Sequence, residues 1–165
     1  MSDREFEPRP IVETLLAHGV RFIMIGGLAA RLRGSPSITD DMEICYARDA
    51  DNLAALANAL VELRAKLRGA AVDVPFVLDA KTLAAGDHFA FSTRRGPLDC
   101  LGTPAGTSGF DELDRRASTM EIGGRDVRVA SIDDLITMKL ATGRQKDLVE
   151  VEILGALRRE HDEQR

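Results

Sequence analysis

The sequence predicts a protein of the α/β (α+β) class, because patterns typical of strands and of helices alternate along the chain. A run typical of a buried strand, Val20 to Ile25, leads through two glycines directly into a helical run. Between Asp49 and Leu67, leucines recur every three or four residues, which predicts a long amphipathic helix. With 165 residues, 44% of them hydrophobic, the chain is long enough for one core. We therefore expect a single domain over residues 1–165, with its core over about 10–157.

Glycine and proline bound the elements expected in the first half. Gly19 ends a first helix, because glycine readily takes the left-handed conformation at a helix end. Gly34-Ser35-Pro36 ends a second one. The expected elements are a helix from Pro10 to Ala17, a strand from Val20 to Ile25, a helix from Leu28 to Leu32, a strand from Asp41 to Tyr46, and the long helix.

Short strands and two final helices are expected in the second half. Gly123-Gly124-Arg125-Asp126 predicts the turn of a hairpin, and Ser131 with Asp134 three residues later predicts a capped helix start. The expected strands are Val72 to Leu78, His88 to Thr93, Leu98 to Leu101, Thr119 to Ile122 and Val127 to Ala130. A short helix is expected after the loop 102–109, followed by helices from Ile132 to Thr142 and from Gln145 to Arg159.

Charge and hydropathy exclude some classes of function. The longest uncharged apolar stretch, Phe22 to Ala30, is too short to span a bilayer, and the first residues lack the pattern of a signal peptide. We therefore expect a cytoplasmic protein with no membrane partner. The net charge of -5 argues against a surface that binds nucleic acid over its whole extent. The second half nevertheless concentrates arginine and lysine, which fits either a local basic groove or an ordinary solvated surface.

Three carboxylates stand at positions where they can meet. In a strand, residues two apart face the same side about 6–7 Å from each other, so Asp41 and Glu43 can share a ligand. Asp99 lies on the expected strand Leu98 to Leu101. Carboxylate oxygens are ligands that Mg²⁺ prefers, with substrate phosphates and waters completing its shell. The three residues therefore predict a site for Mg²⁺ or Mn²⁺. The alternative is that Asp41 and Glu43 form the polar face of a half-exposed strand.

The two glycines after the first strand, Gly26 and Gly27, suit the approach of a phosphate. Lacking side chains, they let backbone N–H groups come close to an anion at the start of a helix. For the glycines alone, a tight strand-to-helix corner chosen for packing is the alternative. Together with the carboxylates they indicate an enzyme that handles nucleotides.

The segment from Phe22 to Ile44, FIMIGGLAARLRGSPSITDDMEI, resembles the signature of the DNA-polymerase-beta-type nucleotidyltransferase superfamily. The resemblance is to the branch of minimal bacterial nucleotidyltransferases and AbiEii-like toxins. A second segment, Ser131 to Leu148, is similar to the C-terminal helical signature of that branch, a lysine followed by Gly-Arg-x-Lys-Asp. With the Asp99 strand, the resemblance spans about Val20 to Leu154, most of the chain.

This resemblance implies a fold and a reaction. The fold is a mixed central β-sheet with helices packed on it and with C-terminal helices. The substrate is a nucleoside triphosphate (NTP), from which a nucleoside monophosphate is transferred to a hydroxyl while pyrophosphate leaves, with Mg²⁺ or Mn²⁺ as cofactor. The implied acceptor is tRNA or another RNA, or a protein, and a toxin of this kind would have an antitoxin partner. A small acceptor such as an aminoglycoside is disfavoured, because enzymes for such acceptors usually carry a further domain.

The resemblance also implies roles for individual residues. Asp41, Glu43 and Asp99 would be the catalytic metal ligands, and Asp99 would also be the general base for the acceptor hydroxyl. Lys139 would be a catalytic residue beside the triphosphate. The nucleotide or acceptor would further be contacted by Gly26, Gly27, Arg144, Lys146 and Asp147.

Two positions depart from the family pattern. Glu43 stands where many relatives have Asp, and Ser37 stands where an Arg often lies. Ser35, Ser37 and Thr39 still offer hydroxyls that can donate hydrogen bonds to a phosphate, although a polar loop explains them at least as well. The departures leave an alternative function, a catalytically silent nucleotide- or RNA-binding module of the same fold.

Overall fold

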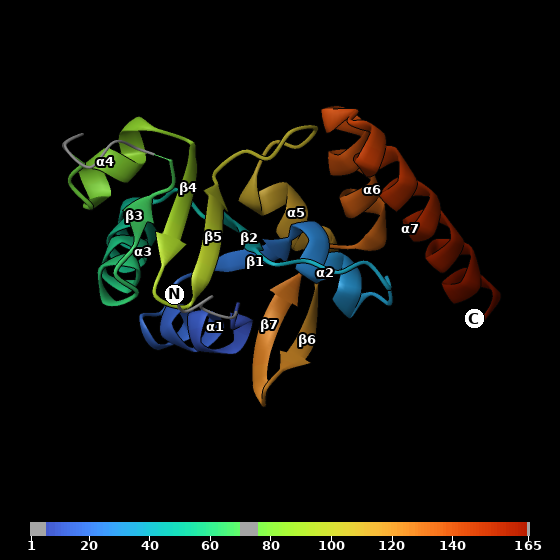
Figure 1. Cartoon of the computed structure of the whole chain (residues 1–165), viewed down its shortest axis with the longest axis horizontal. Helices are drawn as coiled ribbons and strands as arrows, with labels where there is room; N and C mark the ends of the chain where they lie inside the picture. Colours follow the sequence, from blue (N-terminus) through green and yellow to red (C-terminus); the bar gives the residue numbers. More distant parts are fainter. Residues whose placement is uncertain (1–5, 70–75, 165) are drawn as a thin grey trace.

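Seven strands form one mixed sheet in the part of the chain that the computed structural model describes, residues 6–69 and 76–164. The strands lie in the order β3-β4-β5-β2-β1-β7-β6 (Figure 1). Their bounds are β1 Phe22–Ile25, β2 Met42–Tyr46, β3 Lys66–Leu67, β4 His88–Thr93, β5 Gly96–Leu101, β6 Ser118–Ile122 and β7 Arg125–Val129. The predicted fold class, a mixed central sheet with helices, is confirmed.

Seven helices accompany the sheet in the same described residues. They are α1 Pro8–Ala17, α2 Gly26–Leu32, α3 Ala50–Glu62, α4 Ala80–Ala85, α5 Phe110–Arg116, α6 Ile132–Thr142 and α7 Gln145–Glu163. Figure 1 shows α3 and α4 at one end of the molecule, beside β3, and α6 and α7 at the other. Helix α6 contacts both α7 and α2. Helix α6 therefore packs against the helix that begins at the glycine corner. None of the described helices is long and apolar enough to cross a membrane.

Strand β2 lies at the centre of the sheet, between β1 and β5. It pairs antiparallel with β1, where Glu43 is opposite Ile25, and parallel with β5, where Glu43 is opposite Asp99. Residues directly paired on neighbouring strands face the same side of the sheet. The register therefore places Glu43 beside Asp99 and beside the residue that precedes Gly26.

The central strands and the long helix supply most of the core that surrounds this position. All four residues of β1 are buried, as expected for a strand covered on both faces. On α3, the predicted leucine stripe is buried, with Leu53, Leu56 and Leu60 at most 4% exposed. In β2, Glu43 is half-buried and the other four residues are buried. A single carboxylate thus interrupts an otherwise apolar central strand.

The long helix predicted over Asp49 to Leu67 is wrong at its C-terminal end. Helix α3 ends at Glu62, and the edge strand β3 follows. Arg64 takes a left-handed φ of 55°, and the N–H of Ala65 donates to the carbonyl of Leu60 at 3.0 Å. This is the hydrogen bond of a Schellman motif, whose left-handed position is usually a glycine. Because an arginine holds that position here, no residue in the sequence signals the end of the helix.

Smaller differences concern the segment before β4 and the hairpin formed by β6 and β7. Residues 72–75 of the predicted strand Val72 to Leu78 lie outside the described residues, and residues 76–78 form no strand. Helix α4, which the sequence analysis did not predict, begins after Asp79, whose carboxylate accepts a hydrogen bond from the N–H of Thr82 at 2.8 Å. The predicted hairpin is confirmed as β6 and β7, but its turn is shorter than predicted, because Arg125 and Asp126 belong to β7.

The strained residue Arg64 leads to a prediction about stability. A left-handed conformation costs a residue with a side chain about 1–2 kcal/mol. Glycine avoids this cost, but it loses more conformational entropy on folding, which offsets about 0.5–1 kcal/mol of the gain. We expect Arg64→Gly to raise the free energy of unfolding by about 0.5–1 kcal/mol, measured by urea titration. Arg64→Ala keeps the strain and should bring no such gain. Equal values for both variants would contradict the assignment of strain at this residue.

Candidate functional site

The three carboxylates predicted to hold a metal converge at the centre of the sheet. One carboxylate oxygen from each of Asp41, Glu43 and Asp99 lies within 4.8 Å of the other two. The pairing of β2 with β5 brings Glu43 and Asp99 together, and Asp41 precedes β2 by one residue. Three carboxylates at this separation repel one another unless a cation lies between them. The geometry therefore fits a divalent metal ion.

The electrostatics at Glu43 also favour a bound cation. Burial, followed by the negative charge of Asp41, raises the pKa of Glu43 above its ordinary value. The positive charge of Lys139 opposes the rise, and Asp99 adds to it. A carboxylate whose charge is disfavoured by burial and by like charges is stabilised when a cation binds to it. The side-chain oxygens are thus suited to Mg²⁺ or Mn²⁺, which prefer oxygen ligands.

Asp99 has a buried side-chain oxygen that lacks a hydrogen bond and could serve as a metal ligand. Its Oδ1 is buried and, among the described side-chain atoms, is the one buried oxygen or nitrogen without a hydrogen bond. The Nη2 of Arg68 lies 2.9 Å from this oxygen without forming a hydrogen bond to it, whereas it does donate a hydrogen bond to the carbonyl of Phe91 at 2.7 Å. The contact between Arg68 and Asp99 is therefore a close charge contact without hydrogen-bond alignment. A buried oxygen of this kind is costly unless another partner binds it.

The loop before β2 holds the first carboxylate in place. The hydroxyl of Thr39 lies 3.0 Å from Oδ1 of Asp41 and donates to it. The same threonine packs against Gly27, where an added Cβ would come within 3.0 Å of the Thr39 Cβ. Thr39 thus links the glycine corner to Asp41, and no side chain larger than hydrogen fits between them without a shift.

Gly26 brings the backbone against the second carboxylate. Its φ of +71° is in the left-handed region, and an added Cβ would lie 2.8 Å from both Cδ and Oε2 of Glu43. Glycine is required here both for the backbone conformation and for the close approach. The predicted corner at Gly26-Gly27 therefore exists, and α2 begins at Gly26 rather than at the predicted Leu28.

A pocket of about 380 Å³ opens beside the carboxylates, within the size range of small-molecule sites. Glu43 and Gly26 form part of its wall, and the opposite wall comes from α6 and the start of α7. Lys139 and Arg144 bring positive charge to that wall, and His88 lies on the strand side. One carboxylate of the cluster, Glu43, thus lines the pocket together with the cations Lys139 and Arg144.

A buried aspartate fixes both of these cations. Asp147 on α7 has a side chain that is only 1% exposed. It lies 2.7 Å from Nε of Arg144 and 3.4 Å from Nζ of Lys139, and it accepts a hydrogen bond from the hydroxyl of Thr142 at 2.8 Å. Burial favours its neutral form, but the bonds from Arg144, Thr142 and Lys139 outweigh that effect and lower the pKa of Asp147 to about 2. Asp147 therefore positions the cations of the pocket wall and does not itself face the pocket.

Two residues predicted to contact the nucleotide lie elsewhere. Ser35 is buried, and its hydroxyl donates to Oε1 of Glu150 at 2.9 Å, while the hydroxyl of Ser37 donates to Oε2 of the same residue at 2.7 Å. The hydroxyl proton of Ser35 is thus already bound within the fold, which disagrees with its predicted donation to a phosphate. Lys146 is exposed and does not line the pocket, unlike Lys139 and Arg144.

The sequence analysis missed three residues that the fold brings to the site. Arg68 was hidden because β3 fell within a predicted helix, and His88 because a lone histidine at a strand end carries no pattern. Thr142 was treated as the end of α6, although its hydroxyl binds Asp147. The spacing of Thr142, Arg144 and Asp147 across one helix junction was the signal that could have found it.

Comparison with known proteins supports the fold. No family model matches the chain, and no curated protein matches it in sequence. Among solved structures, a lincosamide antibiotic adenylyltransferase, LnuA, aligns with a TM-score of 0.62 and 14% identity, over 95% of this chain and 98% of its own. The antibiotic-resistance factor ANT(2'')-Ia aligns with a TM-score of 0.54 and 16% identity, over 94% and 91%.

A candidate nucleotidyltransferase from Thermotoga maritima, TM1012, aligns with a TM-score of 0.50 and 16% identity, over 98% of both chains. The protein thus has the nucleotidyltransferase fold, as the resemblance to the DNA-polymerase-beta-type superfamily implies. Its expected place in the AbiEii-like branch stays a prediction.

The close approach at Gly26 can be separated from its backbone strain by a matched pair of variants. Gly19 has the same φ of +71° but no atom within 4 Å of an added Cβ. We expect Gly19→Ala and Gly26→Ala to lose similar stability, about 1–2 kcal/mol each from the backbone. Only Gly26→Ala should displace Glu43 and weaken Mn²⁺ binding, by about tenfold or more. Urea unfolding and Mn²⁺ titration measure the two effects, and equal Mn²⁺ affinity in both variants would contradict the close approach.

Asp147 leads to a prediction about stability and pH. Asp147→Asn changes a buried carboxylate that accepts four hydrogen bonds from three residues into an amide with one acceptor oxygen, which we expect to cost about 1–3 kcal/mol. Because the folded pKa of about 2 lies below the ordinary aspartate value, the ionised form stabilises the fold above about pH 4. This contribution is lost as the pH falls from about 4 towards 2.

The Asn variant should lack that part of the acid destabilisation in urea titrations at each pH. Asp133→Asn is the control, since its ion pair with Arg158 is exposed and should matter by less than about 1 kcal/mol. An equal pH profile for wild type and Asp147→Asn would overturn the assigned role.

Proposed function

We propose that this protein is a metal-dependent nucleotidyltransferase that transfers a nucleoside monophosphate from an NTP to an acceptor hydroxyl and releases pyrophosphate. One observation carries the proposal. In a chain with the nucleotidyltransferase fold, carboxylate oxygens of Asp41, Glu43 and Asp99 lie within 4.8 Å of one another beside the corner at Gly26. If Asp41 and Glu43 were only the polar face of a half-exposed strand, there would be no reason for a third carboxylate from another strand to lie at the same point.

The residues of the pocket suit the parts of an NTP. Lys139 and Arg144 lie along one wall and would bind the phosphates, whose charge they match. Backbone N–H groups at Gly26 and Gly27 would approach the phosphates where the chain has no side chains. Thr39 lies at the same corner through its contact with Gly27, and exposed Lys146 would act only at the rim.

The carboxylates would bind and orient the reacting groups. Asp41, Glu43 and Asp99 would hold Mg²⁺ or Mn²⁺, which when bound neutralises phosphate charge and lowers the pKa of an attacking hydroxyl. Asp99 has a buried oxygen without a hydrogen bond and would accept the proton of the acceptor hydroxyl. Catalysis in this scheme comes chiefly from positioning and charge neutralisation, as is general for phosphoryl transfer.

The acceptor is proposed to be an RNA. The side chains of Arg64 after α3, Lys66 on β3 and Arg94 at the β4–β5 turn are exposed, and no ion pair joins them to another described residue. Lys66 pairs with Ser92, and Ala90 two residues earlier pairs with Asp99, so Lys66 faces the same side of the sheet as the carboxylates. An unpaired basic edge beside the proposed base favours a polyanion over a cationic small molecule.

Other acceptors remain as alternatives to RNA. A protein acceptor, and an antitoxin as regulator, follow from the AbiEii-like resemblance alone. The argument from chain length against a small acceptor does not hold, because the LnuA structure, described as lincomycin-bound, is covered over 98% of its length. A catalytically silent nucleotide-binding module is the alternative that Glu43 and Ser37 motivate. A cytoplasmic location stays a prediction.

The reaction can be tested with labelled NTPs, Mg²⁺ or Mn²⁺, and three acceptors: total RNA, soluble protein and a panel of hydroxylated antibiotics. We expect label to enter RNA, and Asp41→Asn to reduce transfer by at least about 10²-fold, since even indirect partners of metal ligands cost 10–100-fold. Asp40→Asn is the matched control, because Asp40 is exposed and lies outside the carboxylate cluster. Binding of NTP without transfer to any acceptor would instead support the silent module.

A further inference from the structure

Arg68 is a cation that the scheme above does not use. It lies one residue beyond β3, at the edge of the sheet, and its Nη2 is 2.9 Å from Oδ1 of Asp99. Among the described residues, Asp99 is the only member of the carboxylate cluster with an arginine or lysine within ion-pair distance. The other two, Asp41 and Glu43, form no ion pair there.

Strand β4 fixes the position of this arginine. The backbone N–H of Arg68 donates to the carbonyl of Ala90 at 2.8 Å, and its Nη2 donates to the carbonyl of Phe91 at 2.7 Å. Ala90 is in turn paired with Asp99 across β4 and β5. The guanidinium therefore reaches over β4 to the carboxylate and is placed by main-chain groups, not by Asp99.

The contact between the two charges is easily exchanged. The Asp99 oxygen has no hydrogen bond although the guanidinium is close. The side chain of Arg68 is 36% exposed, whereas that of Asp99 is 16% exposed. An arginine normally binds a carboxylate through two aligned N–H groups, so this pair lacks its strongest geometry. The guanidinium has access to water, which can replace both Asp99 and the Phe91 carbonyl as its partner, but the buried oxygen of Asp99 needs another cation when it leaves.

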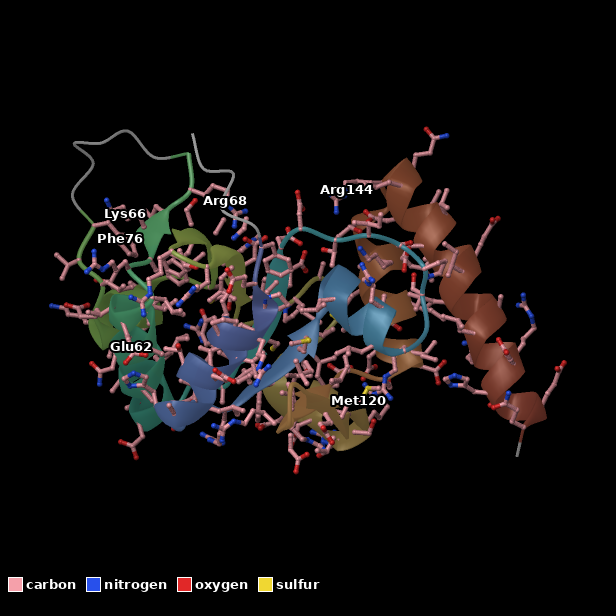
Figure 2. The ribbon with its side chains drawn as sticks, turned by 60° about the horizontal axis from the view of Figure 1, so that its bottom comes forward. Glu62, Lys66, Arg68, Phe76, Met120 and Arg144 are labelled. Carbon is pink, nitrogen blue, oxygen red and sulfur yellow. The ribbon has the colours of Figure 1, made fainter. Side chains whose placement is uncertain are left out.

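Figure 2 shows where Arg68 stands relative to the other wall of the site. Arg68 and Arg144 lie along the same edge of the molecule, one on the side of β3 and one at the start of α7. Arg144 lines the pocket beside Glu43, whereas Arg68 contacts Asp99. Arg144 thus lies on the proposed nucleotide side of the carboxylate cluster, and Arg68 lies on the proposed acceptor side.

We propose that Arg68 is a positioning residue that holds Asp99 and competes with the divalent cation for it. The guanidinium is the counter-ion of Asp99 in the free protein and turns away when a metal ion binds the three carboxylates. It then faces the acceptor side with its charge unpaired, beside Lys66. This inference rests on the proposed function, because it assumes that the carboxylates bind metal.

The test is Mn²⁺ titration of the full-length protein, followed by electron paramagnetic resonance of free Mn²⁺. Arg68→Gln removes the charge but keeps a shorter polar side chain, and Arg68→Met removes the side-chain donors as well; the backbone bond to Ala90 remains in both. Removal of a partly exposed ion pair changes an equilibrium at the carboxylate by about tenfold or less. We therefore expect both variants to bind Mn²⁺ more tightly than wild type, by up to about tenfold.

Lys66→Gln is the matched control, because it removes one positive charge from the same edge without touching Asp99. Its Mn²⁺ affinity should stay within about twofold of wild type, since an exposed charge at a distance is screened. A gain as large as that of Arg68→Gln would show a general charge effect and overturn the inference.

The remaining outcomes separate the two proposals. Unchanged or weaker Mn²⁺ binding in both Arg68 variants, with wild type binding and urea unfolding showing folded proteins, overturns the competition but leaves the proposed function intact. Absence of Mn²⁺ binding in wild type and in both variants overturns the proposed function and the inference together. Arg68→Gln remains informative if Arg68→Met does not fold, because it keeps a polar side chain at this partly exposed position.

Discussion

The pairing of β2 with both of its neighbours is the constraint on which the site depends. Glu43 is opposite Ile25 in β1 and opposite Asp99 in β5. A slip of one residue in either pairing would turn Glu43 to the other face of the sheet, because side chains alternate along a strand. The buried residues on both sides of Glu43 make such a slip costly, since it would expose them and bury the carboxylate. The hydrophobic core thus sets the position of the catalytic candidates.

The C-terminal helix completes the site through two buried acids, Asp147 and Glu150, which lie three residues apart on one face of α7. Asp147 holds the cations of the pocket wall, and Glu150 holds the loop before β2 through Ser35 and Ser37. That loop continues to Thr39, which binds Asp41. The helix therefore connects the cationic wall of the pocket with the first carboxylate, although no residue of α7 belongs to the carboxylate cluster.

The sequence predicted those parts of the site that depend on local pattern. The strand containing Glu43, the glycine corner and the cap at Ser131 follow from alternation, glycine and capping chemistry, and the structure has all three. What could not be predicted depends on pairing between distant segments. Arg68 reaches Asp99 only because β3 joins the edge of the sheet, and the helix end before it is formed by an arginine in a conformation usual for glycine. Likewise, nothing local indicates that Ser35 faces Glu150.

The balance of charge around the cluster bears on the order of binding. The positive charges of Lys139 and Arg144 are partly neutralised by Asp147, and that of Arg68 by Asp99. With Asp41 and Glu43 added, negative charges outnumber positive ones at the site. A triphosphate entering alone would meet this excess and be repelled, whereas a divalent cation would be attracted. Once a cation is held by the carboxylates, the same pocket wall becomes favourable for phosphate. In the proposed reaction the metal would therefore enter before, or together with, the nucleotide, and the displacement of Arg68 from Asp99 would belong to that first step.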